Sequence, residues 1–426
     1  MNDLAQHSLY AASETFGLPI AEPEEVGISS QRLQRIAPLM KAYVDNGRAP
    51  GVLTAIARHG KVVHVQAQGF ADQEAAMPLK TDSIFRIYSM TKPVTAVALM
   101  LLYEEGKVFL DDPVADYLPE FSNMMVHTEA GLVPAESAIT LRHLLMHTSG
   151  LTYSMVPNVP AVSALYEAAQ LNEARSRLAQ RNLAQHVQAL AEFPLIAQPG
   201  TAWHYCEGVS VVARVIEVVS GQGYGDFIAQ RIFAPLAMVD TGYSVAPENT
   251  SRLTALYEQQ PATAEGAPTG FMHTQGYGGD YRLAPALEAG GAGLLSTAAD
   301  YLRFAQMLLN AGELDGTRLL SPSSVKLIVS NQLGPEFGDQ PLASLAPKYK
   351  GVGFGLCGYV VTDAIARGGS GSNGEYGWSG WASTRFWIDP QEGLIGLVFT
   401  QLIPQPDQLF DLSERMHQMT YQALVE

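Results

Sequence analysis

The stretch FRIYSMTKPVTAVALMLLYEEGK, residues 85–107, places a serine and a lysine three positions apart, just before a run of apolar side chains. Residues 94–102 are apolar on nearly every side, which is typical of a helix buried in a core. Pro93 is tolerated only in the first turn of a helix, and Gly106 suits the position just after a helix C-terminus. The pattern predicts a buried helix with Ser89 at or beside its N-terminus.

The spacing of Ser89 and Lys92 predicts an activated nucleophile. Residues three apart share one face of a helix, so the lysine amine can reach the serine oxygen. Burial and the positive end of the helix dipole favour a neutral amine, which can accept the serine proton. An N-cap serine beside a solvated lysine is the alternative. Ser323 and Lys326 have the same spacing in SPSSVK but have the features of a capped, half-exposed helix, so spacing alone decides little.

Composition limits the classes of function. The chain has 426 residues, of which 47% are hydrophobic and 16% charged, as expected for a globular protein with one elaborate domain or two. A net charge of -16 argues against nucleic acid and anionic membranes as partners. The first 20 residues show no secretory signal pattern, and the longest largely apolar run is shorter than the roughly 20 residues that cross a bilayer. We expect a cytoplasmic protein with no membrane contact.

Neither a metal nor a cofactor is expected. Cys206 and Cys357 are too few for a disulfide framework, and no CxxC spacing occurs. His143 and His147 have the spacing of a zinc helix, but the glutamate of HExxH is absent. The glycine-rich residues 367–377 read as a loop that precedes a strand, since no helix follows to complete a phosphate cradle.

Hairpin patterns lie near both ends of the chain. Residues 50–72 alternate on either side of RHGK, and residues 381–401 form a second pattern that turns at DPQEG, before a closing helix over residues 407–425. We expect these strands to share one antiparallel sheet. Between them, roughly over residues 89–309, helical periodicity dominates. The sequence predicts an α+β fold, in which helices flank an antiparallel sheet and a mainly helical second part is inserted.

Four further motifs follow Ser89 in an order that is specific as a set. They are LLMHTSGL (144–151), PGTAWHYCEGVSVVARVIEVVSG (199–221), AGGAGLLSTAADYLRFAQMLLNAGELDG (289–316) and GWSGWASTRFWIDP (377–390). In this order the chain resembles the serine β-lactamase and penicillin-binding superfamily. It most resembles the class C-like branch, and within it the family VIII carboxylesterases and related acyltransferases. The resemblance covers roughly residue 50 to the C-terminus.

The resemblance implies a β-lactamase/transpeptidase-like fold with two domains. Residues 1–85 and 285–426 would form a discontinuous α/β domain that contains the antiparallel sheet. Residues 86–284 would form the mainly helical domain. The active site would lie in the cleft between the two domains.

The resemblance also implies a role for Tyr205, which stands where the family has the tyrosine of its YxN motif. A lysine ammonium nearby favours the phenolate, so this tyrosine can act as a general base. A core tyrosine with a satisfied hydroxyl is the alternative. Glu207 occupies the asparagine position, which puts an amide-binding role there in doubt.

The sequence WSG, residues 378–380, stands where β-lactamases and peptidases have KTG. An indole cannot replace the lysine charge, so anionic substrates are disfavoured and packing against an uncharged ester is favoured. The resemblance implies an oxyanion hole made by the backbone NH groups of Ser89 and Trp381. Strand alternation puts Arg385 on the face opposite Trp378. The substrate-binding residues that we expect are Trp378, Ser379, Gly380 and Tyr153.

The expected function is ester cleavage by double displacement. Ser89, deprotonated by Lys92 and Tyr205, attacks the carbonyl of a small-molecule ester, and water then releases the acyl group. This predicts a carboxylesterase.

An acyltransferase would let an alcohol or amine replace water, and a β-lactamase or D-aminopeptidase/D,D-peptidase is a further alternative. A non-catalytic binding protein of this fold would be expected to lose one of the three residues. The GxSxG motif that carries the nucleophile of α/β-hydrolases does not occur in the sequence, so an esterase of the α/β-hydrolase type is excluded. The oligomeric state is not predicted.

Overall fold

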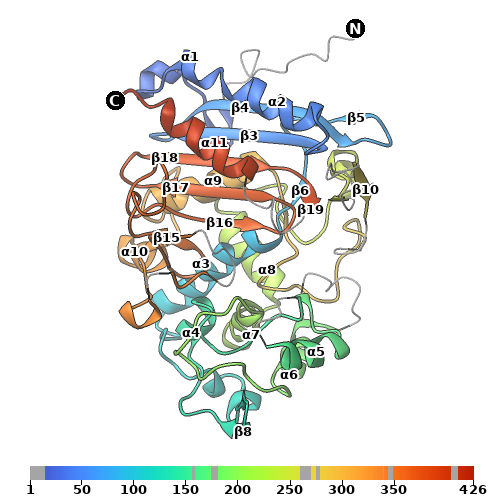
Figure 1. The fold of residues 1–426 in the computed structure, drawn as a ribbon, viewed down its shortest axis with the longest axis vertical. Coiled ribbons are helices and arrows are strands. Elements are labelled where there is room, and N and C mark those ends of the chain that lie inside the picture. The colour runs from blue at the N-terminus through green and yellow to red at the C-terminus, as the bar shows by residue number, and fades with distance from the viewer. Residues whose placement is uncertain are drawn as a thin grey trace.

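An eight-stranded antiparallel sheet organises one half of the molecule (Figure 1). The computed structural model describes residues 15–155, 159–173, 181–259, 270–274, 279–338, 340–343, 349–403 and 411–426. In spatial order the strands are β14 (Val352–Phe354), β15 (Tyr359–Val361), β16 (Tyr376–Gly380), β17 (Thr384–Asp389), β18 (Leu394–Phe399), β3 (Gly51–Arg58), β4 (Lys61–Asp72) and β5 (Met77–Pro78). This confirms the α+β fold with a large antiparallel sheet.

Both predicted hairpins are present. β3 and β4 pair through a turn at His59 and Gly60, whose φ angles of 50° and 78° suit the right-handed twist of a tight hairpin. β17 and β18 pair around residues 390–393. β18 also pairs with β3, so the two ends of the chain share one sheet, as the sequence predicts. The glycine-rich loop over residues 367–375 leads into β16, again as predicted.

Helices cover the two faces of this sheet. α1 (Ser30–Leu33), α2 (Ile36–Asp45) and α11 (Asp411–Gln422) bury apolar side chains against one face, where Met40 and Met416 join Trp387 in a cluster. α9 (Ala298–Leu309) packs on the other face, where Tyr301 contacts Phe386 edge-on. The predicted closing helix is α11, and residues 407–410 of that prediction lie outside the described residues.

The remaining helices lie mainly below the sheet in Figure 1. They are α3 (Thr91–Glu104), α4 (Leu141–Leu145), α5 (Pro160–Ala168), α6 (Leu183–Leu190), α7 (Gly208–Ser220), α8 (Tyr224–Ile228) and α10 (Pro322–Val329). Short strands accompany them as the pairs β1 (Thr15–Phe16) with β2 (Leu18–Pro19), β6 (Phe85–Arg86) with β11 (Leu295–Ser296), β7 (Met125–Thr128) with β8 (Gly131–Pro134), and β12 (Glu313–Leu314) with β13 (Thr317–Arg318). None of the helices in the described ranges combines the length and apolarity that a bilayer crossing requires.

A small sheet joins the two predicted domains. β9 (Tyr257–Gln259) and β10 (Phe271–His273) lie in the segment predicted to be mainly helical, yet β9 pairs in parallel with β19 (Leu402–Ile403) near the C-terminus. Tyr257 and Leu402 are buried together there. The division into residues 1–85 with 285–426 and residues 86–284 stays a prediction.

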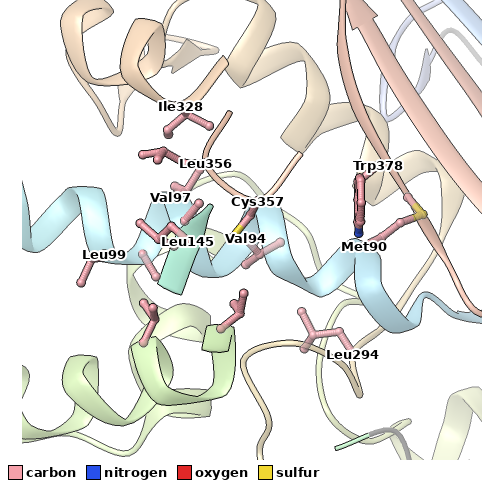
Figure 2. Packing of buried hydrophobic residues seen from close by; sticks show 14 of the residues in the cluster. Met90, Val94, Val97, Leu99, Leu145, Leu294, Ile328, Leu356, Cys357 and Trp378 are labelled. Atoms are coloured by element: carbon pink, nitrogen blue, oxygen red, sulfur yellow. The ribbon is translucent and has the colours of Figure 1, made fainter. Parts of the chain in front are cut away.

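The helix α3 lies at the centre of the main core, the large cluster of buried apolar residues. Every residue from Thr91 to Leu102 is buried. Figure 2 shows Val94 and Val97 of α3 among side chains from several elements, including Leu145 of α4 and Ile328 of α10. A helix enclosed on all sides is fixed in position by packing, so the residues at its N-terminus are fixed as well.

Candidate active site

Ser89 lies in a short 3-10 helix, η2 (Tyr88–Met90), which continues directly into α3. Two contacts hold this turn: the Tyr301 hydroxyl donates to the Met90 carbonyl oxygen at 2.9 Å, and the Ile87 NH donates to the Leu294 carbonyl oxygen at 3.0 Å. Tyr88 has a φ of 42°, a left-handed value that a tyrosine rarely adopts. Strained residues of this kind persist where the surroundings fix them, and they gather at functional sites.

The structure brings Ser89, Lys92 and Tyr205 together. The Tyr205 hydroxyl donates to Ser89 Oγ at 2.8 Å, and Lys92 Nζ lies 3.4 Å from the same oxygen. Lys92 Nζ is also 4.9 Å from the centroid of the Tyr205 ring. Ser89 is half-buried, whereas Lys92 is fully buried. The serine oxygen therefore lies within reach of two groups that can exchange protons with it.

The contacts of Lys92 favour an ammonium, whereas the sequence argument favoured a neutral amine. Nζ donates to Glu173 Oε1 at 3.1 Å, to the Tyr153 hydroxyl at 3.0 Å and to the Gly291 carbonyl oxygen at 2.7 Å. Burial alone would lower the pKa of Lys92, but the negative charge of Glu173, together with Tyr205, raises this pKa above its ordinary value. The sequence argument weighed burial and the helix dipole without this carboxylate.

Aromatic side chains fix the ring of Tyr205, which precedes α7. His147 meets the ring edge-on with centroids 4.7 Å apart, and the Trp378 ring is 5.6 Å away. His147 Nδ1 lies 3.3 Å from the Cys206 thiol. Burial raises the pKa of Cys206 to about 12, so this thiol is not a nucleophile, in keeping with the packing role expected for it.

The carboxylate of Glu207 pairs with His186. His186 Nε2 and Glu207 Oε2 are 2.6 Å apart, and both side chains are buried. Burial raises the pKa of Glu207 above its ordinary value, although His186 opposes this effect. The residue at the asparagine position of the motif is therefore held by a partner within the protein.

The strand β16 presents Trp378 to the site. Trp378 pairs with Phe386 across the sheet, whereas Ser379 pairs with Arg385. Arg385 bonds to Glu414 at 2.6 Å on the α11 side, so it lies on the face opposite Trp378, as predicted. By the same alternation the Ser379 side chain lies on the Arg385 face, and the expected substrate contact of Ser379 stays a prediction.

Gly380 lets this strand approach the nucleophile turn. A side chain at Gly380 would overlap the carbonyl group of Ile87, two residues before Ser89. The next residue, Trp381, packs against a cluster that contains Tyr88. The backbone of residues 380–381 is thus adjacent to the turn that carries Ser89, and the oxyanion-hole role of the two NH groups stays a prediction.

The second serine and lysine pair lies on the surface. Ser323 and Lys326 are exposed on α10, and Ser321, not Ser323, caps this helix by accepting from the Ser324 NH at 3.2 Å. The interpretation of this motif as a capped, half-exposed helix is confirmed, and the capping residue is Ser321, two residues before Ser323.

Sequence reasoning missed Glu173 and the contact of Tyr153 with Lys92. Glu173 lies shortly after α5, and its carboxylate accepts from the hydroxyls of Tyr153 and Ser210. Tyr153, expected to bind substrate, is buried and belongs to the hydrogen-bond partners of Lys92. No local sequence pattern predicts these contacts, because Tyr153 and Glu173 lie 61 and 81 positions from Lys92 in the sequence.

Comparisons with known proteins show the family of this chain. A family model described as Beta-lactamase matches residues 36–417. Protein Rv1367c of Mycobacterium tuberculosis is 33% identical over 373 residues, which are 86% of this chain and 89% of that protein. Esterase EstB of Burkholderia gladioli is 30% identical over 365 residues, which are 83% and 86% of the two chains. The solved structure of EstCE1, described as a hydrolase with promiscuous acyltransferase activity, is 26% identical with a TM-score of 0.75, covering 93% of this chain and 98% of that one.

Proposed function

The chain belongs to the Beta-lactamase family, and on that premise we propose that it is a carboxylesterase of the family VIII type that cleaves a small, uncharged ester. The observation that carries the proposal is the contact of 2.8 Å between the Tyr205 hydroxyl and Ser89 Oγ, beside the buried ammonium of Lys92. The similarity to an esterase that is 30% identical over most of both chains supports the same reaction class.

The reaction proceeds through an acyl-enzyme. Tyr205 first releases its own proton to solvent, and its oxygen then takes the proton of Ser89 as the serine oxygen forms a bond to the ester carbonyl carbon. The NH groups of Ser89 and Trp381 stabilise the oxyanion, and Tyr205 then gives the proton to the departing alcohol as the ester C–O bond breaks. Water, deprotonated by Tyr205, attacks the acyl group, and the proton returns to Ser89. Lys92 remains charged throughout and favours the phenolate form of Tyr205.

Trp378 supports an uncharged substrate over penicillins or D-alanyl peptides. Its indole lies beside Tyr205 at the position where β-lactamases and peptidases have a lysine, and it supplies no positive charge for a substrate carboxylate. A β-lactamase or D,D-peptidase is therefore the less favoured alternative. The proposal includes an active site between the two predicted domains and a cytoplasmic location. Ser89 comes from η2, Tyr205 from the segment before α7, and Trp378 from the sheet.

The first prediction tests Ser89 against its surface counterpart. A p-nitrophenyl ester of a short acid should release phenolate in a burst that matches the enzyme concentration, and Ser89→Ala should lower turnover by at least about 10³-fold. The mass of the intact protein should rise by one acyl group, which peptide mapping should place on Ser89. Ser323→Ala is the matched control and should leave burst and turnover unchanged. If Ser323→Ala loses turnover and Ser89→Ala does not, the assignment of Ser89 as the nucleophile is wrong.

An acyltransferase is the second candidate, because EstCE1 is described as a hydrolase with promiscuous acyltransferase activity. Both reactions share the acyl-enzyme and differ in whether water or another nucleophile removes the acyl group. We expect water to prevail for simple alcohols and amines at millimolar concentration, so the free acid should be the main product. Capture of most of the acyl group by one such acceptor, against water at roughly 55 M, would require a positioned acceptor and would assign a transferase.

A further inference from the structure

The carboxylate of Glu173 is buried among several hydrogen-bond donors and makes more contacts than a single ion pair would. It is buried, and one oxygen accepts from Lys92 Nζ at 3.1 Å. The hydroxyls of Tyr153 and Ser210 also donate to it. A side chain at Gly291 would overlap both carboxylate oxygens, so glycine leaves the space that the carboxylate occupies.

Glu173 is the anion that accompanies Lys92. A buried ammonium without a nearby anion costs several kcal/mol, so the protein would otherwise favour the neutral amine. Burial disfavours the charged forms of four other titratable groups that interact with Lys92 within the described ranges, which are His147, Cys206, Cys357 and Tyr153. Tyr205 carries a negative charge only after it has released its proton, so it is not a permanent counter-ion of Lys92. Glu207 lies close enough to influence Glu173, but its own partner is His186.

We propose that Glu173 is a positioning residue that keeps Lys92 an ammonium and thereby leaves Tyr205 as the group that accepts the proton of Ser89. The inference rests on the proposed function. An ammonium has no lone pair with which to deprotonate Ser89, whereas it stabilises a phenolate beside it. Within the described residues, the Glu173 carboxylate bonds to Lys92, Tyr153 and Ser210 and not to Ser89, so its effect passes through Lys92.

Replacement of the carboxylate should make Lys92 titrate in an accessible range of pH. In Glu173→Gln the ammonium keeps its burial but loses its counter-ion, so its pKa falls. As Lys92 then loses its proton, Tyr205 loses the positive charge that favours its phenolate. In the parent the pKa of Lys92 is raised above its ordinary value by the charge of Glu173, so we expect no such loss of activity between about pH 7 and 9.5.

The experiment is the pH profile of kcat/KM with a neutral p-nitrophenyl ester. We expect the parent to show no basic limb up to about pH 9.5, and Glu173→Gln to show one in which kcat/KM falls about tenfold per pH unit. Glu173→Asp keeps the charge and should remove this limb again, even if its rate is lower. Glu25→Gln removes an exposed carboxylate that pairs with Lys61 and should keep the profile of the parent. A uniform loss of rate in Glu173→Gln, without a new limb, would overturn the proposal.

A second measurement does not depend on activity. Protein labelled with ¹³C at the lysine ε-carbon gives one signal for Lys92, identified by its loss in Lys92→Met. This signal should keep the shift of an ammonium across the pH range in the parent and should titrate in Glu173→Gln. If the parent signal titrates as a neutral amine near pH 7, the role of Glu173 is wrong even if Ser89 is acylated. If the Lys92 signal behaves as expected but Ser89 is never acylated, the proposed esterase function is wrong, and so is the role of Glu173 in catalysis.

Discussion

At Lys92, the charge of one side chain decides which residue can act as a base. Three buried acceptors surround its amine: a carboxylate, a phenol and a carbonyl oxygen. An isolated buried ion pair contributes little to stability, since the cost of removing both charges from water offsets their attraction. The pair of Lys92 and Glu173 is therefore better explained by the charge that it maintains beside Tyr205 than by the free energy of folding.

At Gly380, the absence of a side chain decides how closely two segments approach. The end of β16 lies against the carbonyl group of Ile87, where a methyl group would not fit. This contact fixes the separation between the strand and the turn that carries Ser89. Because two NH groups must meet one oxygen atom in an oxyanion hole, the separation has to be correct to within a fraction of an ångström.

At the scale of elements, a buried polar cluster fastens α11 to the sheet. Glu375, the residue before β16, accepts from the hydroxyls of Tyr359 and Tyr421 at 2.9 Å, lies 2.7 Å from His417 Nε2 and accepts from Arg367 at 3.3 Å. Burial opposes the charged form of Glu375, but His417 and nearby arginines outweigh burial and lower the pKa of Glu375 to about 2. The carboxylate is thus more favoured in the folded chain than in the unfolded one.

This shift predicts how stability depends on pH. A carboxyl group whose pKa falls from 4.5 to about 2 on folding stabilises the protein fully above pH 4.5 and loses this contribution as the pH falls through about 2. Glu375→Gln should lower the free energy of unfolding by about 3–5 kcal/mol at neutral pH, because buried partners are left behind. The difference from the parent should shrink between about pH 5 and 3, as measured by urea unfolding at each pH.

An exposed carboxylate provides the control for this measurement. Glu25 pairs with Lys61 at 3.1 Å in a largely exposed position, so Glu25→Gln should change the free energy of unfolding by less than about 1 kcal/mol at every pH. A penalty for Glu375→Gln that stays the same from neutral to acidic pH would show that the charge of Glu375 is not what stabilises α11.

Elements whose signals are local could be predicted from the sequence. The hairpin of β3 and β4 is encoded by alternation and by a turn at Gly60, and the start of α3 is encoded by Pro93. The small sheet of β9, β10 and β19 could not be predicted. Its strands are two or three residues long, and β9 pairs with a strand more than 140 positions away, so no periodicity marks it.

At the scale of the whole molecule, the same distinction explains the site. Ser89 and Lys92 are neighbours in sequence, and Tyr205 and Trp378 were found through ordered motifs. Glu173 belongs to none of those motifs, and only the folded chain brings it to Lys92. The charge of Lys92 depends on this distant residue, so the sequence around Lys92 could not determine its protonation state.

The main core extends through the whole molecule. It contains residues of the sheet, such as Ile395, and residues of the helical part, such as Leu144, together with the enclosed helix α3. Because each part is buried partly by the other, opening one of them would expose apolar surface of both. We therefore expect the two predicted domains to unfold together, although chains of this length often unfold in steps.

Calorimetry should accordingly show a single unfolding transition. Leu144→Ala and Ile395→Ala each remove a buried side chain, should cost about 2–5 kcal/mol, and should each shift this one transition to lower temperature. Val239→Ala is the control, because Val239 is 84% exposed and its truncation should change stability by less than about 0.5 kcal/mol. If calorimetry instead shows two transitions, and each core variant lowers the temperature of only one of them, the two domains are stable independently. In that case the position of Lys92 and Tyr205 against the sheet would be set by an interface between domains, and not by the continuous packing around α3.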